Sequence, residues 1–228
     1  MYLCSMAIIL NLETSTKNCS VSIAKDGVQL CLIEESEESY AHGEKLNQFV
    51  DWCINGAEIE IKDIDAVCVS KGPGSYTGLR IGVSSAKGFA YGLDKPLLAV
   101  NTLDVLVNSQ INKGFDFIVP MIDARRMEVY TAIFDGQGKQ LTETEAKVIE
   151  ETSFEDLQGK KIVFIGDGAE KCKDVLAHLN AIFIQEYPSA KNMISFSENN
   201  YLQKSFEDVA YFEPFYLKDF IAGKKKTQ

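Results

Sequence analysis

The feature that most limits how this chain can fold is an order of strands and helices that occurs twice. The first half opens with three short runs typical of a strand meander, at 7–12, 19–24 and 28–33. Helical spacing of apolar residues then alternates with short apolar runs, which predicts a helix around 46–53, a strand at 66–70, a helix at 79–91, a strand at 97–100 and a helix capped by Thr102. The order is β-β-β-α-β-α-β-α.

The same order starts again at Phe117. It predicts strands at 117–122 and 128–134, a third strand towards Ile149, a short helix with capping-box spacing at Thr152 and Glu155, a strand at 161–165, a helix at 169–179, a strand at 181–184 and a helical stretch after Pro188. We therefore expect an α/β fold of two lobes, 1–107 and 108–228, with a cleft between them. A return of the extreme C-terminal segment to the first lobe stays open.

Charge limits the classes of function. The 228 residues include 23 Lys and Arg against 33 Asp and Glu, a net charge of −10. Most of such a surface repels phosphodiester backbones, so autonomous nucleic-acid binding is not the expected primary function. Protein partners and small ligands fit better.

Cysteine usage and the N-terminus point to a compartment. The six cysteines form no CxxC pair, which indicates reduced, buried thiols rather than disulfides or a zinc site. No basic residue precedes the apolar run 6–10, and no run approaches the roughly 20 apolar residues of a membrane span. We expect a soluble, cytoplasmic protein with no membrane contact.

A glycine-rich segment at 71–80 lies between a predicted strand and a predicted helix. Backbone N–H groups there could hold an anion, but the spacing matches neither of the common phosphate-binding motifs. We favour packing, because Gly78, Gly82, Ala86 and Ala90 recur every four residues and form a flat ridge. The sequence leaves open whether that ridge meets its own sheet or another chain.

Other chemical motifs are weak. A turn is the favoured interpretation of Gly166-Asp167-Gly168, and a surface ion-pair turn that of Asp123-Ala124-Arg125-Arg126, although a ligand-facing pair stays open. Neither His42 nor His178 has a metal ligand four residues later, and no Ser/His/Asp triad is indicated.

Several motifs together resemble the bacterial TsaB (YeaZ) family strongly. They cover nearly the whole chain: 8–16, 19–23, 72–82, 123–130, 166–169 and 214–218. Two positions depart from the family pattern, since Glu13 stands where Asp is more common and Lys218 where Arg is common.

The resemblance implies an actin-like (ASKHA, ribonuclease-H-like) fold with duplicated lobes, in agreement with the repeated element order. It also implies a role in making threonylcarbamoyladenosine, the tRNA modification beside the anticodon. In that pathway a TsaC-type enzyme makes threonylcarbamoyl-adenylate and TsaD transfers the threonylcarbamoyl group, with TsaB and the ATPase TsaE as helpers.

The resemblance also bears on catalysis. TsaD has a metal-binding H-x-x-x-H pair where this chain has Thr102 and Leu106, and neither side chain replaces an imidazole ligand. TsaD has a Ser-Gly-Gly turn where this chain has 123–126, and bulky arginines hinder close approach of a phosphate. We therefore expect a non-catalytic subunit with no catalytic residue, metal or cofactor of its own. A nucleotide at the interface with TsaD stays open.

In the family, the first two helices bundle with those of TsaD, or with a second TsaB copy when TsaD is missing. The equivalent helices are 42–55 and 79–91, and the expected partner-binding residues are His42, Leu46, Phe49, Gly78, Leu79, Gly82, Ala86 and Ala90. TsaE is expected as a third component, and tRNA contact is expected to be indirect. Gly82→Leu is expected to weaken association with TsaD, or to unfold the chain if the ridge faces the sheet.

Two other classes of function remain as alternatives. An ATP-dependent phosphotransferase or ATPase of the same fold would use Glu13, Thr14 and the cleft glycines Gly166 and Gly168, the weak candidates for cofactor binding. A glycoprotease is the other, and the missing histidine pair argues against it.

Overall fold

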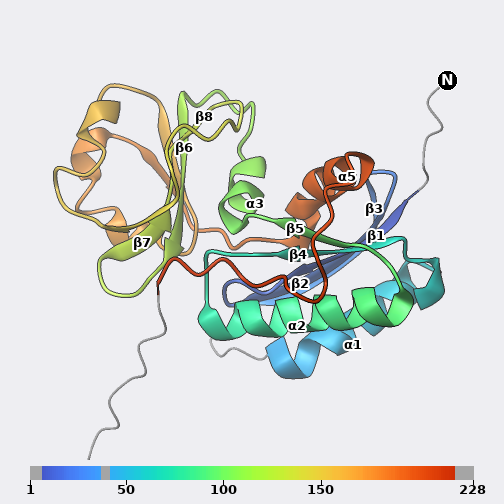
Figure 1. Ribbon diagram of the computed structural model, residues 1–228. Coiled ribbons are helices and arrows are strands. Elements are labelled where there is room, and N and C mark those ends of the chain that lie inside the picture. Colours follow the sequence, from blue (N-terminus) through green and yellow to red (C-terminus); the bar gives the residue numbers. More distant parts are fainter. Residues whose placement is uncertain (1–6, 37–41, 219–228) are drawn as a thin grey trace, which may run out of the picture.

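The computed structural model describes residues 7–36 and 42–218, which form two lobes, each built on a mixed sheet (Figure 1). The sheet of the first lobe has the order β3-β2-β1-β4-β5. Its strands are β1 (Ile8–Glu13), β2 (Asn18–Lys25), β3 (Val28–Ser36), β4 (Ala66–Ser70) and β5 (Leu97–Val100). The first three strands pair antiparallel, whereas β1, β4 and β5 run parallel.

The sheet of the second lobe repeats this topology, with the order β11-β10-β6-β7-β9. Its strands are β6 (Phe117–Asp123), β7 (Glu128–Thr131), β9 (Glu145–Val148), β10 (Ile162–Ile165) and β11 (Ile182–Ile184), and β8 (Phe134–Asp135) pairs with β6. The three-strand meander and the two parallel strands occupy equivalent places in both sheets. The expected α/β fold with a duplicated order of strands and helices is confirmed.

Two long helices cover one face of the first sheet, α1 (His42–Gly56) and α2 (Tyr76–Leu93), which lie side by side (Figure 1). Their inner residues join a buried cluster with Leu10, Leu12, Val67 and Val69 of the sheet. α2 begins at Ser75, whose side chain accepts a hydrogen bond from the Gly78 amide at 3.3 Å. A short 3-10 helix, η1 (Ile61–Asp63), leads from α1 to β4.

The two lobes exchange their last helices. α3 (Thr102–Asn108) follows the first sheet but packs against β6 of the second. Conversely η4 (Ala190–Met193) and α5 (Ile194–Leu202) follow the second sheet and pack on β1 and β5 of the first. The side-chain amide of Asn108 donates a 2.8 Å hydrogen bond to the Asn192 carbonyl, so the exchanged elements also contact each other. The chain therefore returns to the first lobe well before its C-terminal end.

Residues 205–218, here called the C-terminal strap, run beside the first lobe towards β7 (Figure 1). Glu207 forms a bridge with Leu97 of β5. Further along, the Lys87 ammonium on α2 donates to the carbonyls of Ala210 and Phe212 at 3.1 and 3.0 Å. The strap thus ties the helical layer of the first lobe to the junction of the lobes.

Local details correct four expectations. The N-cap of α3 is Asn101, not Thr102, because the Asn101 side chain accepts from the Leu103 amide at 2.9 Å. The expected capping box is absent: η2 (Glu155–Leu157) begins after Phe154 without a side-chain cap. The expected strand 128–134 is split into β7 and β8. Between them, the Ile133 amide donates to the Thr142 hydroxyl instead of to the backbone of a neighbouring strand.

The fourth correction concerns the expected helix 169–179. The structure has only α4 (Ala169–Cys172) and the 3-10 helix η3 (Ala177–Leu179) in this range. Ala169, Cys172, Leu176 and Leu179 are nevertheless all buried in the core of the second lobe. The segment thus packs one side into the core as a helix would, although two short helices replace the continuous one expected.

The five described cysteines are free thiols, and four of them are buried: Cys19, Cys53, Cys68 and Cys172. Cys4 and the lysine run 224–226 lie outside the described residues. Among the residues that the structure describes, no helix combines the length and the apolar character needed to cross a bilayer.

Candidate functional site

The candidates Glu13 and Thr14 lie at the carboxyl end of the central strand β1, where Glu13 ends the strand and Thr14 begins the turn that follows it. Glu13 is completely buried, and its Oε1 accepts a 2.6 Å hydrogen bond from the Ser15 amide. Burial raises the pKa of this carboxyl above its usual value, against the hydrogen bonds from Ser15. One oxygen of Glu13 is thus engaged in shaping its own turn.

The glycine-rich segment packs directly on this turn. The Ser75 amide donates to the Ser15 carbonyl at 2.6 Å, and the Thr14 hydroxyl donates to the Gly78 carbonyl at 2.8 Å. A Cβ added at Gly78 would overlap the Thr14 carbonyl oxygen, and one at Gly82 would overlap the Thr14 hydroxyl. The glycines allow close approach of two backbones, so the packing interpretation is confirmed.

The small-residue ridge of α2 therefore faces its own sheet, because Ala86 and Ala90 are buried on the same side. All eight residues expected to bind a partner are buried within the lobe: His42, Leu46, Phe49, Gly78, Leu79, Gly82, Ala86 and Ala90. His42, for example, donates from Nε2 to the Thr16 carbonyl at 2.7 Å. A partner that docks on α1 and α2 would meet the outward residues of these helices instead.

The outward side of α1 and α2 carries exposed glycines and exposed aromatic side chains. Gly88 and Gly92 have no atom within 4 Å of the position where a Cβ would stand. Trp52 is 48% exposed and Tyr91 is 84% exposed. In the sequence, the ridge from Gly78 to Ala90 was the more obvious pattern. The signal that could have revealed the outward face is the second pair of glycines on the same helix, Gly88 and Gly92, which are also four residues apart.

The two positions that correspond to the histidine pair of TsaD lie in the protein interior. The Thr102 hydroxyl is 2.7 Å from the Ser70 hydroxyl, and both are buried. Leu106 packs in an apolar cluster with Ile118 and Phe134 of the second lobe. Within residues 7–36 and 42–218, no group of three His, Cys, Asp or Glu side chains is placed to hold a metal ion.

In the second lobe, Gly166 and Gly168 lie against β6. A Cβ at Gly166 would overlap the Met121 carbonyl oxygen, and the Gly168 amide donates to that oxygen at 2.9 Å. Between them, Asp167 accepts a 2.9 Å hydrogen bond from the Asp123 amide, and burial raises its pKa to about 6. The favoured interpretation of this motif as a turn is confirmed, and the turn supports the segment 123–126.

That segment has an unusual backbone. Arg125 and Arg126 both have left-handed conformations, with φ of 71° and 51°. Asp123 stabilises the turn, because its carboxylate accepts from the Arg125 amide at 2.9 Å and from the Lys171 ammonium. Both arginines are exposed, whereas the Asp123 charge is compensated locally. Asp123 thus forms its ion pair with Lys171 rather than with the arginines of its own turn, and the ligand-facing alternative stays a prediction.

Comparisons with known proteins agree with this structure. Residues 35–226 match the family described as TsaD, tRNA N6-adenosine threonylcarbamoyltransferase. Two similar relatives are named tRNA threonylcarbamoyladenosine biosynthesis protein TsaB. The one from Escherichia coli is 29% identical over 95% of this chain and 97% of its own length. The one from Buchnera aphidicola is 30% identical over 85% of this chain and 95% of its own length. YeaZ from Pseudomonas aeruginosa superposes with a TM-score of 0.80 at 24% identity, over 93% of this chain and all of that chain.

Proposed function

This chain belongs to the TsaB (YeaZ) family, and its residues 35–226 also match the TsaD family. We therefore propose that it is a supporting subunit in the formation of threonylcarbamoyladenosine in tRNA. In this proposal the chain forms a heterodimer with a TsaD-type transferase and stabilises it, while the transferase carries out the chemistry. A TsaE-type ATPase is the third component. In the absence of the transferase, two copies of the chain pair through the same face.

The observation that carries this proposal is the outward face of α1 and α2. A glycine inside a helix costs about 1 kcal/mol relative to alanine, and nothing within the lobe requires Gly88 or Gly92. Exposed aromatic side chains such as Trp52 and Tyr91 are typical of the centres of protein interfaces. Small residues beside large aromatic ones suit close contact with the helices of a partner.

The interior around Thr102 supports a role without chemistry. The Thr102 hydroxyl is bonded to Ser70, and Leu106 fills an apolar cluster, so these positions stabilise the packing of α3. Glu13 is buried and shapes the turn after β1. Of these groups, Leu106 packs against residues of the second lobe, whereas Thr102 and Glu13 bond within the first.

The test is association with the transferase of the same organism, measured by calorimetry with purified full-length proteins. Trp52→Ala is expected to raise the dissociation constant about tenfold or more, as truncation of an interface aromatic does. The matched control is Leu141→Ala, because Leu141 is also 48% exposed but lies on the second lobe. Equal affinities for the wild type and Trp52→Ala, or no association at all, would contradict the proposal.

A further inference from the structure

The arginines of this chain occupy one place in the fold. Of the 23 basic residues only three are arginine, Arg80, Arg125 and Arg126, and the remaining 20 are lysine (23 − 3). Arg80 lies in the second turn of α2, and the other two form the turn between β6 and β7. Although 45 positions separate Arg80 from Arg125 in the sequence, the C-terminal strap contacts both elements that carry them, at Arg80 itself and at Glu128, whose amide donates to the Arg125 carbonyl.

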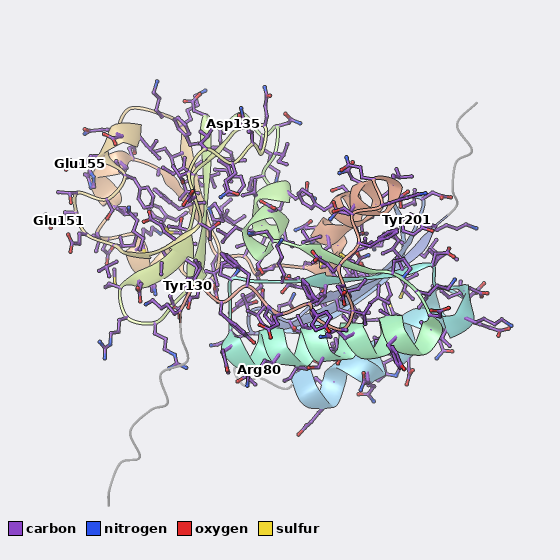
Figure 2. The ribbon with its side chains drawn as sticks, viewed as in Figure 1. Arg80, Tyr130, Asp135, Glu151, Glu155 and Tyr201 are labelled. Atoms are coloured by element: carbon purple, nitrogen blue, oxygen red, sulfur yellow. The ribbon has the colours of Figure 1, made fainter. Side chains whose placement is uncertain are left out.

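The end of the C-terminal strap connects them. Arg80 lies 4.2 Å from the ring centroid of Tyr76 and donates from Nε to the Tyr216 hydroxyl at 3.3 Å. The two tyrosine rings are 4.9 Å apart. Two residues further on, Lys218 pairs with Glu128 at the start of β7, next to the arginine turn. Figure 2 shows Arg80 and Tyr130 at this junction, one on each lobe.

The surface so formed is cationic although the chain is acidic. Arg80, Arg125, Arg126 and Lys218 are all exposed. The neighbouring acids on the second lobe are already paired, Asp123 with Lys171 and Glu128 with Lys218. The positive charges of the three arginines therefore have no carboxylate partner among the described ion pairs.

We propose that Arg80, Arg125 and Arg126 bind the phosphodiester backbone of RNA, with Tyr76 and Tyr216 beside them. Arginine recognises phosphate through a planar set of donors, and aromatic rings between cations offer stacking for unpaired bases. Local charge rather than net charge governs such contacts, so direct contact replaces the indirect one expected from the net charge of −10. That the RNA is a tRNA rests on the function proposed above.

The test is a titration of the full-length chain into labelled, unmodified tRNA transcript, followed by fluorescence anisotropy at 0.1 M salt. The double variant Arg125→Asn, Arg126→Asn removes two cations, and asparagine tolerates left-handed backbone, so the turn is kept. We expect affinity at 0.1 M salt to fall about 25-fold, and the negative slope of log affinity against log salt to become shallower by about 1.4. The control is Lys204→Asn, because Lys204 is also exposed and left-handed, with φ of 55°.

Absence of saturable binding by the wild type at 50 mM salt, or equal binding by the double variant, would overturn the proposal. If the double variant keeps its RNA affinity but no longer associates with the transferase, the surface binds protein rather than RNA, and the proposal is likewise overturned. Association with the transferase is measured in parallel. Loss of association in Trp52→Ala with unchanged RNA binding would support both proposals, and a wild type that binds RNA without binding the transferase would reject only the proposed function.

Discussion

The Thr14 hydroxyl donates a 2.8 Å hydrogen bond to the Gly78 carbonyl, which joins the turn after β1 to the first turn of α2. This contact requires that the helix carry no side chain at Gly78 and Gly82. The closest backbone contacts of α2 are therefore internal to the lobe. Gly88, Tyr91 and Gly92 of the same helix are exposed instead.

The two sides of α2 predict opposite effects of the same substitution. Gly82→Ala is expected to destabilise the chain by about 1–3 kcal/mol, because the new methyl group would overlap Thr14. Gly88→Ala is expected to stabilise it by about 0.5–1 kcal/mol, since alanine favours the helix and the position is open. Urea unfolding of both variants measures the difference, and equal free energies of unfolding would be inconsistent with the orientation of α2.

A larger side chain at Gly88 is expected to weaken association without weakening the fold. Gly88→Leu is expected to keep the free energy of unfolding at or above that of the wild type, because leucine is a good helix former. It should nevertheless raise the dissociation constant for the transferase at least tenfold by blocking close approach of partner helices. Calorimetry checks the affinity and circular dichroism the fold. Undiminished affinity would place the interface elsewhere.

The ridge illustrates what the sequence could and could not predict. Spacing every four residues correctly placed Gly78, Gly82, Ala86 and Ala90 on one face. The alternation of short apolar runs with helical spacing indicated most of the element order along the chain, but not the order of strands within each sheet. Spacing carries no information on what that face meets, which depends on the approach of Thr14, 64 positions away. The exchange of α3 and α5 between lobes was likewise hidden, because both helices are short and their partners are distant in sequence.

Titration of Asp167 predicts a pH dependence of stability. Burial raises its pKa from 3.8 to about 6 in the folded chain, so the folded state holds the proton more tightly than the unfolded state. Stability contributed by this group is therefore full below pH 3.8 and is lost as pH rises through about 6. Asp167→Asn is expected to remove this loss, so that the free energy of unfolding of the variant at pH 7 exceeds that of the wild type by up to about 3 kcal/mol. Urea unfolding of the wild type and the variant at pH 4 and pH 7 measures this difference in free energy. The same difference at both pH values would show that Asp167 does not have a raised pKa.

Glu13 tests whether the junction of the lobes performs chemistry in this chain. Glu13→Gln keeps an oxygen for the Ser15 amide and removes the cost of a buried charge. We expect the variant to fold and, with the transferase, to support tRNA modification within about twofold of the wild-type rate. A drop of a hundredfold or more with intact association would indicate a catalytic carboxylate, as the phosphotransferase alternative requires.

Whether this chain supports the transferase without catalysing the transfer is decided by a reconstituted modification assay with purified transferase, ATPase and unmodified tRNA, run with and without this chain. We expect the chain alone to form no threonylcarbamoyladenosine, and its addition to the other components to increase product formation. Formation of product by this chain in the absence of the transferase, or an unchanged yield when the chain is added, would show that it is not a supporting subunit.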